Sequence, residues 1–415
     1  MRKEQIKMIK IAVMGYGTVG SGVVEVFYKN RESIQHNAGH EMDIKYILDL
    51  REFPDSPYVD KFTKNFDDII NDDEVQIVVE VMGGATFAYD YVKQCLLKGK
   101  SVATSNKELV AEKGAELIRI AKENNTNFLF EASVGGGIPI LRPITQCLAA
   151  NDITEIYGIL NGTTNYILSK MINESAQFED ALKTAQELGY AERNPAADIE
   201  GHDACRKICI LSALAFGKHV YPKQVHTEGI TDISLDDVSL AGKAGYAVKL
   251  IGKTVHLSDE GKVFTTVYPA LVHAKSQIGN VEGVYNAVMV RGDAIGDVVF
   301  YGQGAGKLPT ASAVVADVID CAKHLNSRKL VCWEDGSDNY VKDYKQDKIA
   351  MYVRIASDDL QASESSAKAA FGDINIIDAD NALAFITPVM PECDFDEKIK
   401  RVSGDVKAKI RVLDI

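Results

Sequence analysis

A glycine-rich turn near the N-terminus constrains the fold of this chain more than any other feature. The apolar run Ile9–Met14 leads directly into the segment GYGTVG at residues 15–20, and helical spacing follows. In a GxGxxG turn the first glycine permits a tight bend, the second lets backbone approach a pyrophosphate, and the third lets helix and strand pack closely. The pyrophosphate then lies at the helix N-terminus. In this position the motif indicates a dinucleotide-binding domain, although a purely structural glycine turn has the same letters.

Strand-like and helical segments alternate through the first part of the chain. Helical spacing appears at Val19–Asn30 and again at Tyr89–Lys98. The apolar runs between such helices are Ile9–Met14, Ile44–Leu48, Val75–Met82, Val102–Thr104 and Phe128–Phe130. Strands that alternate with helices form βαβ units, and right-handed crossovers join these into a parallel sheet. We therefore expect an α/β fold that begins with a Rossmann-type doubly wound domain.

The pattern changes after residue 145. Long helices are predicted at Phe178–Leu188 and Asp203–Phe216, and strands at Lys262–Val267 and Ala287–Val290. This mixture indicates a mixed α+β domain. The glycine-rich segment YGQGAG at residues 301–306 then opens a further helix, where Pro309 suits the first turn.

The C-terminal part is predicted to be a small α+β module. The polar, irregular stretch Asn326–Asp347 is interpreted as a linker, and it is followed by a strand at Ile349–Ile355, a helix at Ser363–Phe371 and a strand at Ala382–Thr387. The expected domains are residues 1–144, completed by 301–325, for nucleotide binding, residues 145–300 for substrate binding and catalysis, and residues 346–415 for the module.

Composition excludes several classes of function. With 415 residues the chain is too long for one hydrophobic core, so about two or three domains are expected. There are 46 lysine and arginine residues against 59 acidic ones, and the formal charge of −13 opposes non-specific binding to nucleic acid or anionic membrane. No apolar run approaches the ~18 residues of a membrane span, and the N-terminus lacks a signal-peptide core. Seven scattered cysteines are typical of reduced thiols in a cytoplasmic protein.

Two residues at the end of the second predicted strand are candidates for ribose binding. Asp49 follows the glycine turn at a longer spacing than the usual ~20 residues, and it could bind the ribose hydroxyls of NAD. Arg51 could instead meet the 2′-phosphate of NADP. A solvated strand end accounts for both residues equally well, so cofactor preference stays open.

Two further segments lie where predicted strands end. Lys107, in the segment VATSNK, belongs at the edge where open sheets bind ligands, although a surface lysine that opens a helix has the same pattern. Glu131 begins the segment EASVGGGIP, whose three glycines expose backbone oxygens. These oxygens, with Glu131, could hold a hard monovalent cation, and an interdomain hinge is an equal alternative.

The stretch at residues 160–207 carries the strongest catalytic signal. Asp203 and Lys207 are spaced i, i+4 on a predicted helix, so they lie on one face about 5–6 Å apart. A carboxylate and an ammonium can then meet the same substrate atom. Glu192 and Asp198 add carboxylates just upstream, and such a pocket suits a zwitterionic amino acid. An exposed helical salt bridge beside a polar loop would look the same.

Seven segments in order resemble the homoserine dehydrogenase family. They are GYGTVG, VVEVMGG, ATSNKELVA, EASVGGGIPI, LNGTTNYIL, LGYAERNPAADIEGHDACRK and YGQGAGKLPTASAVVADV. The resemblance implies NAD(P)-dependent interconversion of L-homoserine and L-aspartate 4-semialdehyde, in the biosynthesis of threonine and methionine. It also implies a cytoplasmic homodimer or homotetramer, with the middle domain serving dimerisation and a small-molecule substrate as the ligand.

The resemblance further implies roles for individual residues. Lys207 is the implied proton donor, and Asp203 orients it. Substrate binding is implied for Glu192, Asp198, Thr163 and Lys107. Cofactor binding is implied for Gly15, Gly17, Thr18, Val19, Gly20, Thr104, Ser105, Lys107 and Gly302. A structural sodium site is implied at Glu131 with the backbone of Val134, Gly136 and Ile138.

The implied chemistry is general acid–base catalysis. Lys207 donates a proton as negative charge grows on the aldehyde oxygen, and in the reverse direction it accepts the hydroxyl proton of homoserine. Because an ammonium has a reference pKa near 10.4, oxidation is expected to favour alkaline pH. A semialdehyde dehydrogenase needs a thiolate beside a base, and no cysteine here sits in a strand-to-helix site beside an obvious histidine. A non-catalytic regulatory protein that binds nucleotide and amino acid would be expected to have lost Lys207 or Asp203.

The C-terminal module resembles an ACT domain, which in relatives binds an amino acid, often threonine, and inhibits the enzyme. ACT domains usually carry a D-x-P-G-V/I pattern between the first strand and helix. Here the corresponding stretch is ASDDLQA at residues 356–362, without proline or glycine. Because side chains with a Cβ resist positive φ, we expect a structural or interfacial module with weak or absent threonine inhibition. A different turn that still binds threonine is the alternative.

Overall fold

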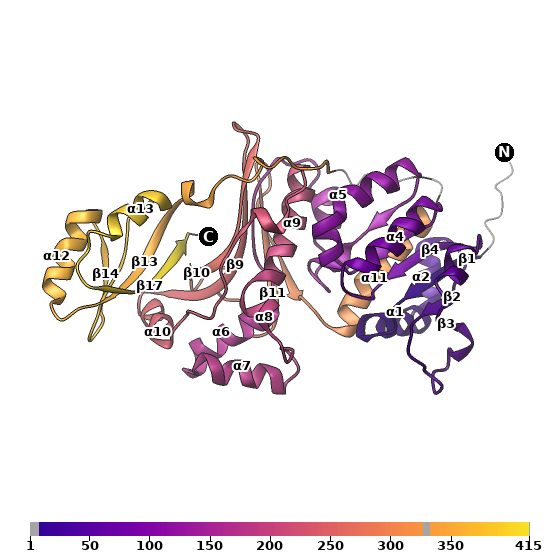
Figure 1. Ribbon diagram of the computed structural model, residues 1–415, viewed down its shortest axis with the longest axis horizontal. Coiled ribbons are helices and arrows are strands. Elements are labelled where there is room, and N and C mark those ends of the chain that lie inside the picture. The colour runs from indigo at the N-terminus through magenta and orange to yellow at the C-terminus, as the bar shows by residue number, and fades with distance from the viewer. Residues whose placement is uncertain (1–7, 326, 328–332, 415) are drawn as a thin grey trace. The chain divides into compact units, whose positions relative to one another are not determined.

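The computed structural model describes residues 8–325, 327 and 333–414. The chain forms two compact units (Figure 1). The first unit contains the chain up to residue 150 together with residues 210–222 and 303–336. The second contains residues 151–209, 223–302 and the chain from residue 337 onward.

A parallel sheet of six strands forms the centre of the first unit. Its spatial order is β3-β2-β1-β4-β5-β6. The strands are β1 (Ile9–Met14), β2 (Met42–Leu48), β3 (Phe62–Thr63), β4 (Val75–Glu80), β5 (Ser101–Thr104) and β6 (Phe128–Leu129). This order, with its reversal between β1 and β4, is that of a Rossmann domain. The predicted parallel domain is confirmed, and each predicted apolar run forms a strand, although several ends are shifted.

Helices pack on this sheet through their apolar faces. They are α1 (Thr18–Lys29), α2 (Arg31–Ala38), α3 (Asp67–Ile70), α4 (Thr86–Leu97), α5 (Lys107–Glu123) and α11 (Lys307–Lys323). Helix α11 comes from late in the chain and packs on α1, where a Cβ added to Gly22 would lie 2.8 Å from the carbonyl oxygen of Lys307. Phe27 of α1 and Val314 of α11 share one buried core with the strands.

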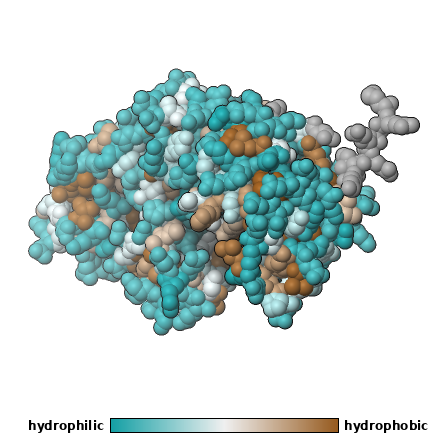
Figure 2. Space-filling model, turned by 45° about the vertical axis from the view of Figure 1, so that its right-hand side comes forward, coloured by the Kyte–Doolittle hydropathy of each residue, from teal (hydrophilic) through white to brown (hydrophobic). Residues whose placement is uncertain are grey.

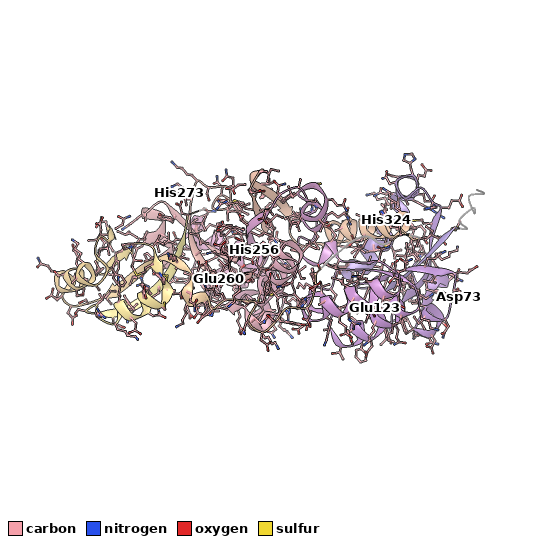
Figure 3. All side chains as sticks on the ribbon, turned by 90° about the horizontal axis from the view of Figure 1, so that it is seen from above. Asp73, Glu123, His256, Glu260, His273 and His324 are labelled. Carbon is pink, nitrogen blue, oxygen red and sulfur yellow. The ribbon has the colours of Figure 1, made fainter. Side chains whose placement is uncertain are left out.

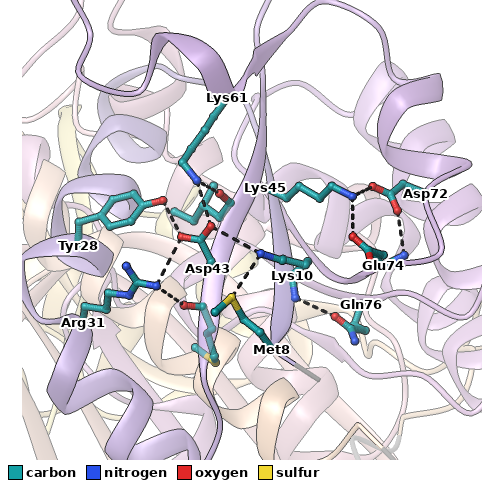
Figure 4. Close-up of polar contacts among 12 residues, drawn as sticks. Met8, Lys10, Tyr28, Arg31, Asp43, Lys45, Lys61, Asp72, Glu74 and Gln76 are labelled. Carbon is teal, nitrogen blue, oxygen red and sulfur yellow. Dashed lines mark hydrogen bonds and ion pairs between the residues drawn. The ribbon is translucent and has the colours of Figure 1, made fainter. Parts of the chain in front are cut away.

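A polar cluster ties the first two strands to the surrounding helices (Figure 4). The carboxylate of Asp43, on β2, accepts hydrogen bonds from the Tyr28 hydroxyl and the Lys61 ammonium, both at 3.1 Å. The cations of Lys10 and Arg31 lie 3.8 and 3.9 Å from the same carboxylate. Burial, followed by the charge of Asp43, raises the pKa of the Tyr28 hydroxyl. The cluster therefore stabilises the fold, because one carboxylate interacts with four neighbouring side chains.

A second, mixed sheet runs through the second unit. Its main order is β12-β11-β7-β9-β10-β17-β13-β15-β14. The first five of these strands are β12 (Gly296–Gln303), β11 (Tyr285–Gly292), β7 (Ile153–Ile159), β9 (Tyr246–Leu257) and β10 (Lys262–His273). The helices of this part are α6 (Gly162–Glu174), α7 (Phe178–Glu187), α8 (Ala196–Ile199) and α10 (Leu235–Lys243). Helix α9 (His202–Phe216) begins in this unit, and its residues from 210 onward belong to the first unit. The predicted mixed α+β character of this region is confirmed.

The C-terminal module has the element order β-α-β-β-α-β. Its elements are β13 (Lys348–Ala356), α12 (Leu360–Phe371), β14 (Asn375–Ile377), β15 (Leu383–Ile386), α13 (Glu392–Ile399) and β17 (Asp405–Leu413), with the two-residue β16 (Met390–Pro391) beside β13. Within the module the spatial order is β17-β13-β15-β14, and all these pairs are antiparallel. Strand β17 also pairs in parallel with β10 through Ala270 and Arg411, so the module continues the same mixed sheet.

The stretch interpreted as a linker is packed where the structure describes it. Residues 326 and 328–332 lie outside the described residues. Trp333 is buried, and a Cβ added to Gly114 of α5 would lie 2.7 Å from its ring. Tyr340 is also buried, and its carbonyl oxygen accepts a hydrogen bond from the backbone N–H of Val263. The polar composition correctly predicted irregular backbone but not these two anchors.

The surface in Figure 2 is mostly hydrophilic, with hydrophobic side chains scattered over it. In the part of the chain that the structure describes, no helix is both long and apolar enough to cross a bilayer. Figure 3 labels His256 and Glu260 near the β9–β10 turn and His324 after α11, where the His324 Nδ1 atom lies 3.2 Å from the carboxylate of Asp320. Among the described residues, no three histidine, cysteine or acidic side chains gather as a metal site.

Candidate active site

The glycine turn between β1 and α1 has the geometry expected of a dinucleotide-binding loop. Gly15 has a φ of +98°, and a Cβ there would lie 2.9 Å from the carbonyl oxygen of Val81. A Cβ on Gly20 would lie 1.9 Å from the carbonyl oxygen of Gly15, so strand and helix need glycine at both positions. Gly17 differs, because no described heavy atom lies within 4 Å of a Cβ built there. Helix α1 starts at the next residue without a side-chain cap, which leaves its first N–H groups available to an anion.

Asp49 and Arg51 form a bidentate pair just after β2. Arg51 donates from Nε and Nη2 to the two carboxylate oxygens of Asp49 at 3.0 and 2.9 Å. The backbone N–H of Tyr16, inside the glycine turn, donates to the same carboxylate at 2.8 Å. The Arg51 hydrogen bond, opposed by burial, lowers the pKa of the Asp49 carboxyl well below its usual range. Both residues line a cavity of about 260 Å³ together with Lys64. The hydrogen bond from Tyr16 places the Asp49 carboxylate beside the glycine turn.

The carboxylate of Glu80 holds two loops together at the carboxyl edge of the sheet. The sequence analysis did not predict this role. Its side chain is fully buried at the end of β4. One carboxylate oxygen accepts the backbone N–H of Met82 at 2.8 Å, and the other accepts the Thr104 hydroxyl at 2.7 Å. Burial raises the pKa of Glu80, while these hydrogen bonds oppose the rise. The segment VVEVMGG contained the signal, since an acidic residue interrupts an otherwise apolar run.

The residues after β5 form a capped helix start. Asn106 accepts the backbone N–H of Leu109 at 3.0 Å and donates to the carbonyl oxygen of Gly84 at 2.6 Å. Thr104 is buried and Ser105 is half-buried beside it. Lys107 is the first residue of α5 and is half-buried. The segment that carries the implied cofactor residues Thr104, Ser105 and Lys107 is therefore held at the carboxyl edge by Glu80 and Asn106.

Glu131 is a buried helix cap in this structure. Its carboxylate accepts the backbone N–H groups of Ile140, Leu141 and Arg142 at 2.7–2.9 Å. Its own N–H donates to Asp317 of α11, whose pKa is raised to about 7 by burial, against the opposing charge of Arg142. The side chain that was expected to ligate a cation is thus engaged by three backbone donors.

The three-glycine segment after Glu131 packs closely against the loop that opens α11. The N–H of Gly137 donates to the carbonyl oxygen of Gln303 at 3.0 Å. Gly136 has a φ of +57°, and a Cβ there would lie 2.3 Å from the carbonyl oxygen of Gly304. Gly302, the implied cofactor residue of this loop, is in β12 one position before Gln303. These glycines permit the close approach of two backbones, which a flexible hinge would not require.

Lys207 and Asp203 form a buried ion pair on α9. The Lys207 Nζ atom lies 2.7 Å from the Asp203 carboxylate, and it also donates to the carbonyl oxygen of Leu160 at 2.7 Å. Both side chains are less than a tenth exposed. The alternative of an exposed helical salt bridge is therefore wrong. An ammonium held between a carboxylate and a carbonyl can donate a proton in a fixed direction.

Asn161 joins two of the predicted carboxylates, and it was not singled out from the sequence. Its Nδ2 atom donates to Asp198 at 2.7 Å and to Asp203 at 2.9 Å. Its Oδ1 atom accepts the backbone N–H of Thr164, so Asn161 also caps α6. The amide is thereby fixed in one orientation, and it brings Asp198 and Asp203 together although they belong to different helices.

Thr163 lies in the first turn of α6, and Glu192 lies in the loop after α7. The Thr163 hydroxyl donates to the carbonyl oxygen of Tyr190 at 2.7 Å and so ties α6 to the segment that follows α7. Glu192 has an exposed side chain, and its carbonyl oxygen accepts a hydrogen bond from Gln186. The structure thus brings Lys207, Asp203 and Asp198 together around Asn161, whereas Glu192 stands at the solvent-facing side of the same region.

Comparisons with family models and with known relatives point to one family. The family model described as "Homoserine dehydrogenase, NAD binding domain" matches residues 15–131, and the model described as "Homoserine dehydrogenase" matches residues 139–319. The chain is 41% identical to homoserine dehydrogenase of Bacillus subtilis, over 77% of this chain and 74% of that protein. It is 38% identical to homoserine dehydrogenase of Helicobacter pylori, over 95% and 91% of the two chains.

Solved structures agree with the sequence comparisons. The crystal structure of a homoserine dehydrogenase from Thiobacillus denitrificans superposes with a TM-score of 0.88 at 36% identity, covering 98% of this chain and 99% of that one. A hyperthermophilic archaeal homoserine dehydrogenase in complex with NADPH has a TM-score of 0.64 at 26% identity, over 76% of this chain and 98% of that one.

The Rossmann domain and its match to an NAD-binding family model place the chain in the class of NAD(P)-dependent oxidoreductases. Within this class, the sequence identities and the family-model matches identify the family. The chain belongs to the homoserine dehydrogenase family.

Proposed function

We propose that this protein interconverts L-homoserine and L-aspartate 4-semialdehyde with NAD(P), as its family membership indicates. The observation that carries the proposal is the buried pair of Lys207 and Asp203 beside Asn161 and Asp198. A general acid and a cluster of carboxylates in one place suit an amino-acid substrate whose side-chain oxygen gains or loses a proton.

Lys207 is proposed to move the proton at the reacting oxygen. The bound nicotinamide supplies hydride chemistry. The Lys207 ammonium donates to the aldehyde oxygen as negative charge develops there, and the neutral amine accepts the hydroxyl proton of homoserine in the reverse direction. Asp203 stabilises the ammonium at 2.7 Å, while the Leu160 carbonyl oxygen holds it from a second direction.

The remaining predicted residues are proposed to bind the non-reacting parts of the ligands. Asp198 and Glu192 bind the substrate amino group, because carboxylates complement an ammonium, and Thr163 holds the segment just before Glu192 through the carbonyl oxygen of Tyr190. Lys107 keeps its proposed place at the cofactor and the substrate. The proposed cofactor residues are Gly15, Gly17, Thr18, Val19, Gly20, Thr104, Ser105, Lys107 and Gly302.

A sodium ion at the three-glycine segment is proposed to bind through main-chain oxygens. Carbonyl oxygens are suitable donors for such a hard cation, and the proposed ones belong to Glu131, Val134, Gly136 and Ile138. The Glu131 carboxylate serves as a cap for residues 140–142 instead, since three N–H groups already bind it. The ion would then reinforce a segment whose backbone is already tightly packed.

Steady-state oxidation of L-homoserine, followed by absorbance of the reduced nicotinamide, tests this function. Activity is expected with at least one of NAD and NADP, and the ratio of kcat/KM values measures which ribose the Asp49–Arg51 pair accepts. A protein that binds nucleotide and homoserine in titrations but produces no reduced cofactor would instead be the non-catalytic regulatory protein.

The substitution Glu192→Ala is expected mainly to raise the KM for homoserine, because the residue is proposed to contact a part of the substrate that does not react. The fold should persist, since Glu192 is exposed. Glu187→Ala, at the exposed end of α7, is the matched control and should leave the KM unchanged. If Glu192→Ala affects homoserine and an analogue without the amino group equally, the amino-group assignment is wrong.

We also propose that the C-terminal module is an ACT-like domain with a structural role. The β-α-β-β-α-β order and the antiparallel pairing support an ACT-like fold. Within the described stretch 356–362 no residue has positive φ. Asp359 caps α12 by accepting the N–H of Ala362, and Ser357 binds the backbone of Asp359. Side-chain caps therefore form the turn that glycine forms in effector-binding ACT domains.

Titration of L-threonine into the homoserine assay is expected to change the rate by less than the ~5-fold at the lower end of usual allosteric coupling. Point variants of the turn are better probes than truncation after Lys345, because β17 completes the sheet beside β10. Strong inhibition that disappears in a Ser357→Ala, Asp359→Ala double variant would show that the module is a working sensor.

A further inference from the structure

A short segment of the second unit links the mixed sheet of that unit to the turn that precedes α9. This segment, Val225–Ile230, is called the strap. Its strand β8 (His226–Thr227) pairs in parallel with β10, and the N–H of Glu228 donates to the carbonyl oxygen of Val267 at 2.8 Å. Two residues later the N–H of Ile230 donates to the carbonyl oxygen of Ile199, also at 2.8 Å. The strap is therefore bonded on one side to the sheet and on the other to the end of α8.

The strap and the turn at residues 198–201 are packed without space between them. A Cβ added to Gly229 would lie 2.1 Å from the carbonyl oxygen of Ile199 and 2.5 Å from the Cα of Glu200. Gly201 has a φ of +83°, and a Cβ there would lie 3.1 Å from the carbonyl oxygen of Glu228. A displacement of the strap must therefore move this turn. The turn carries Asp198 at one end and leads into α9, with Asp203 and Lys207, at the other.

One guanidinium from the C-terminal module holds the strap in place. Arg411 of β17 donates from its two terminal nitrogens to the Glu228 carboxylate at 2.8 and 2.9 Å. It donates from Nε and one terminal nitrogen to Glu392 of α13 at 2.9 and 2.7 Å. The guanidinium carbon lies 4.5 Å from the ring centroid of Tyr268, and the residue is only 5% exposed. Such a buried, doubly bidentate arginine fixes its partners in direction as well as distance.

We propose that Arg411 is a positioning residue for substrate binding: through Glu228 it holds the strap against the turn at residues 198–201, and so makes the affinity for homoserine depend on the C-terminal module. This inference rests on the proposed function only for the identity of the substrate. Asp198 is the part of the substrate cluster that moves with the turn, so the effect is expected in the homoserine KM more than in kcat.

The two carboxylates on the same guanidinium provide a matched pair of variants. Glu228→Gln loosens the bond to the strap, whereas Glu392→Gln loosens a bond within the module and leaves the strap attached. Arg411 stays in place in both variants, which avoids leaving the buried Glu392 and the partly exposed Glu228 carboxylates without a cation. Glu228→Gln is expected to raise the homoserine KM by roughly three- to thirtyfold, with the cofactor KM unchanged. Glu392→Gln is expected to leave the homoserine KM unchanged, although Glu392 is the more buried carboxylate.

Hydrogen exchange of the substrate-free protein gives a second measurement that does not depend on activity. Faster exchange of the amides of residues 199–206 is expected in Glu228→Gln and not in Glu392→Gln, relative to the unsubstituted protein. Equal effects of the two variants on KM and exchange, or no effect of Glu228→Gln on either, would overturn the positioning role. If the unsubstituted protein does not oxidise homoserine, the proposed function fails, and the exchange experiment still decides whether Arg411 and Glu228 hold the turn.

Discussion

Replacing Lys207 with alanine is expected to lower kcat by roughly 10²–10⁴, the usual contribution of a general acid, while the cofactor KM changes little. The reason is the fixed position of its ammonium, 2.7 Å from both the Asp203 carboxylate and the Leu160 carbonyl oxygen. Lys207→Arg is expected to be nearly as inactive, because a guanidinium keeps the positive charge but does not release its proton in the working pH range. Steady-state kinetics in both directions measure these effects.

Lys253→Met is the control for loss of a buried lysine. Lys253 lies 2.5 Å from the Asp347 carboxylate and its side chain is 8% exposed, so the change removes a comparable ion pair outside the proposed site. Its kcat should stay close to that of the unsubstituted protein after correction for the folded fraction. Near-normal kcat for Lys207→Ala would remove this residue from the mechanism, and an active Lys207→Arg would mean that Lys207 contributes charge and not a proton.

Replacing Gly17 with alanine is expected to raise the cofactor KM by about tenfold or more, which corresponds to ~1.4 kcal/mol of lost binding. Gly17 precedes α1 with a φ of −80°, a conformation that alanine adopts without strain. A Cβ there meets no described atom within 4 Å, so the fold should not change. The new methyl group would instead occupy the space where a pyrophosphate approaches the backbone. Titration of NAD(P) against protein fluorescence measures the affinity directly.

Gly242→Ala provides the matched control for Gly17→Ala. Gly242 lies in α10, and the space around its Cβ position is likewise open in the described structure. Its substitution should leave the cofactor affinity unchanged. If Gly17→Ala binds the cofactor as tightly as this control does, the glycine turn is structural and the nucleotide binds elsewhere.

Much of the first unit was predictable because its signals are local. The apolar runs, the helical spacing between them and the glycine turn lie within short windows, and parallel βαβ units leave few topologies for such a pattern. The spacing of Asp203 and Lys207 was likewise sufficient to place them on one helical face. Burial of that pair was not predictable, since it depends on Leu160 and on the packing of α9.

Asn161 and Glu80 show why some site residues were missed. Asn161 appears in the sequence as an ordinary helix cap, and its second role requires Asp198 and Asp203 to come close in space. Glu80 ends a strand, and its partner Thr104 lies on the neighbouring strand. Their side chains were visible in the motifs, but hydrogen bonds between separate elements have no periodic signature.

The sequence by itself determined the Rossmann domain, the placement of Asp203 and Lys207 on one helical face and the presence of a terminal α+β module, because each follows from residue spacing along one or two elements. Only the tertiary structure decided that β17 joins β10 and that Arg411 reaches Glu228. The physical reason is that strand pairing and buried ion pairs between distant segments depend on how the whole chain folds and brings those segments together. Local hydrophobic periodicity specifies which face of a strand is buried, but it does not specify which strand becomes its neighbour.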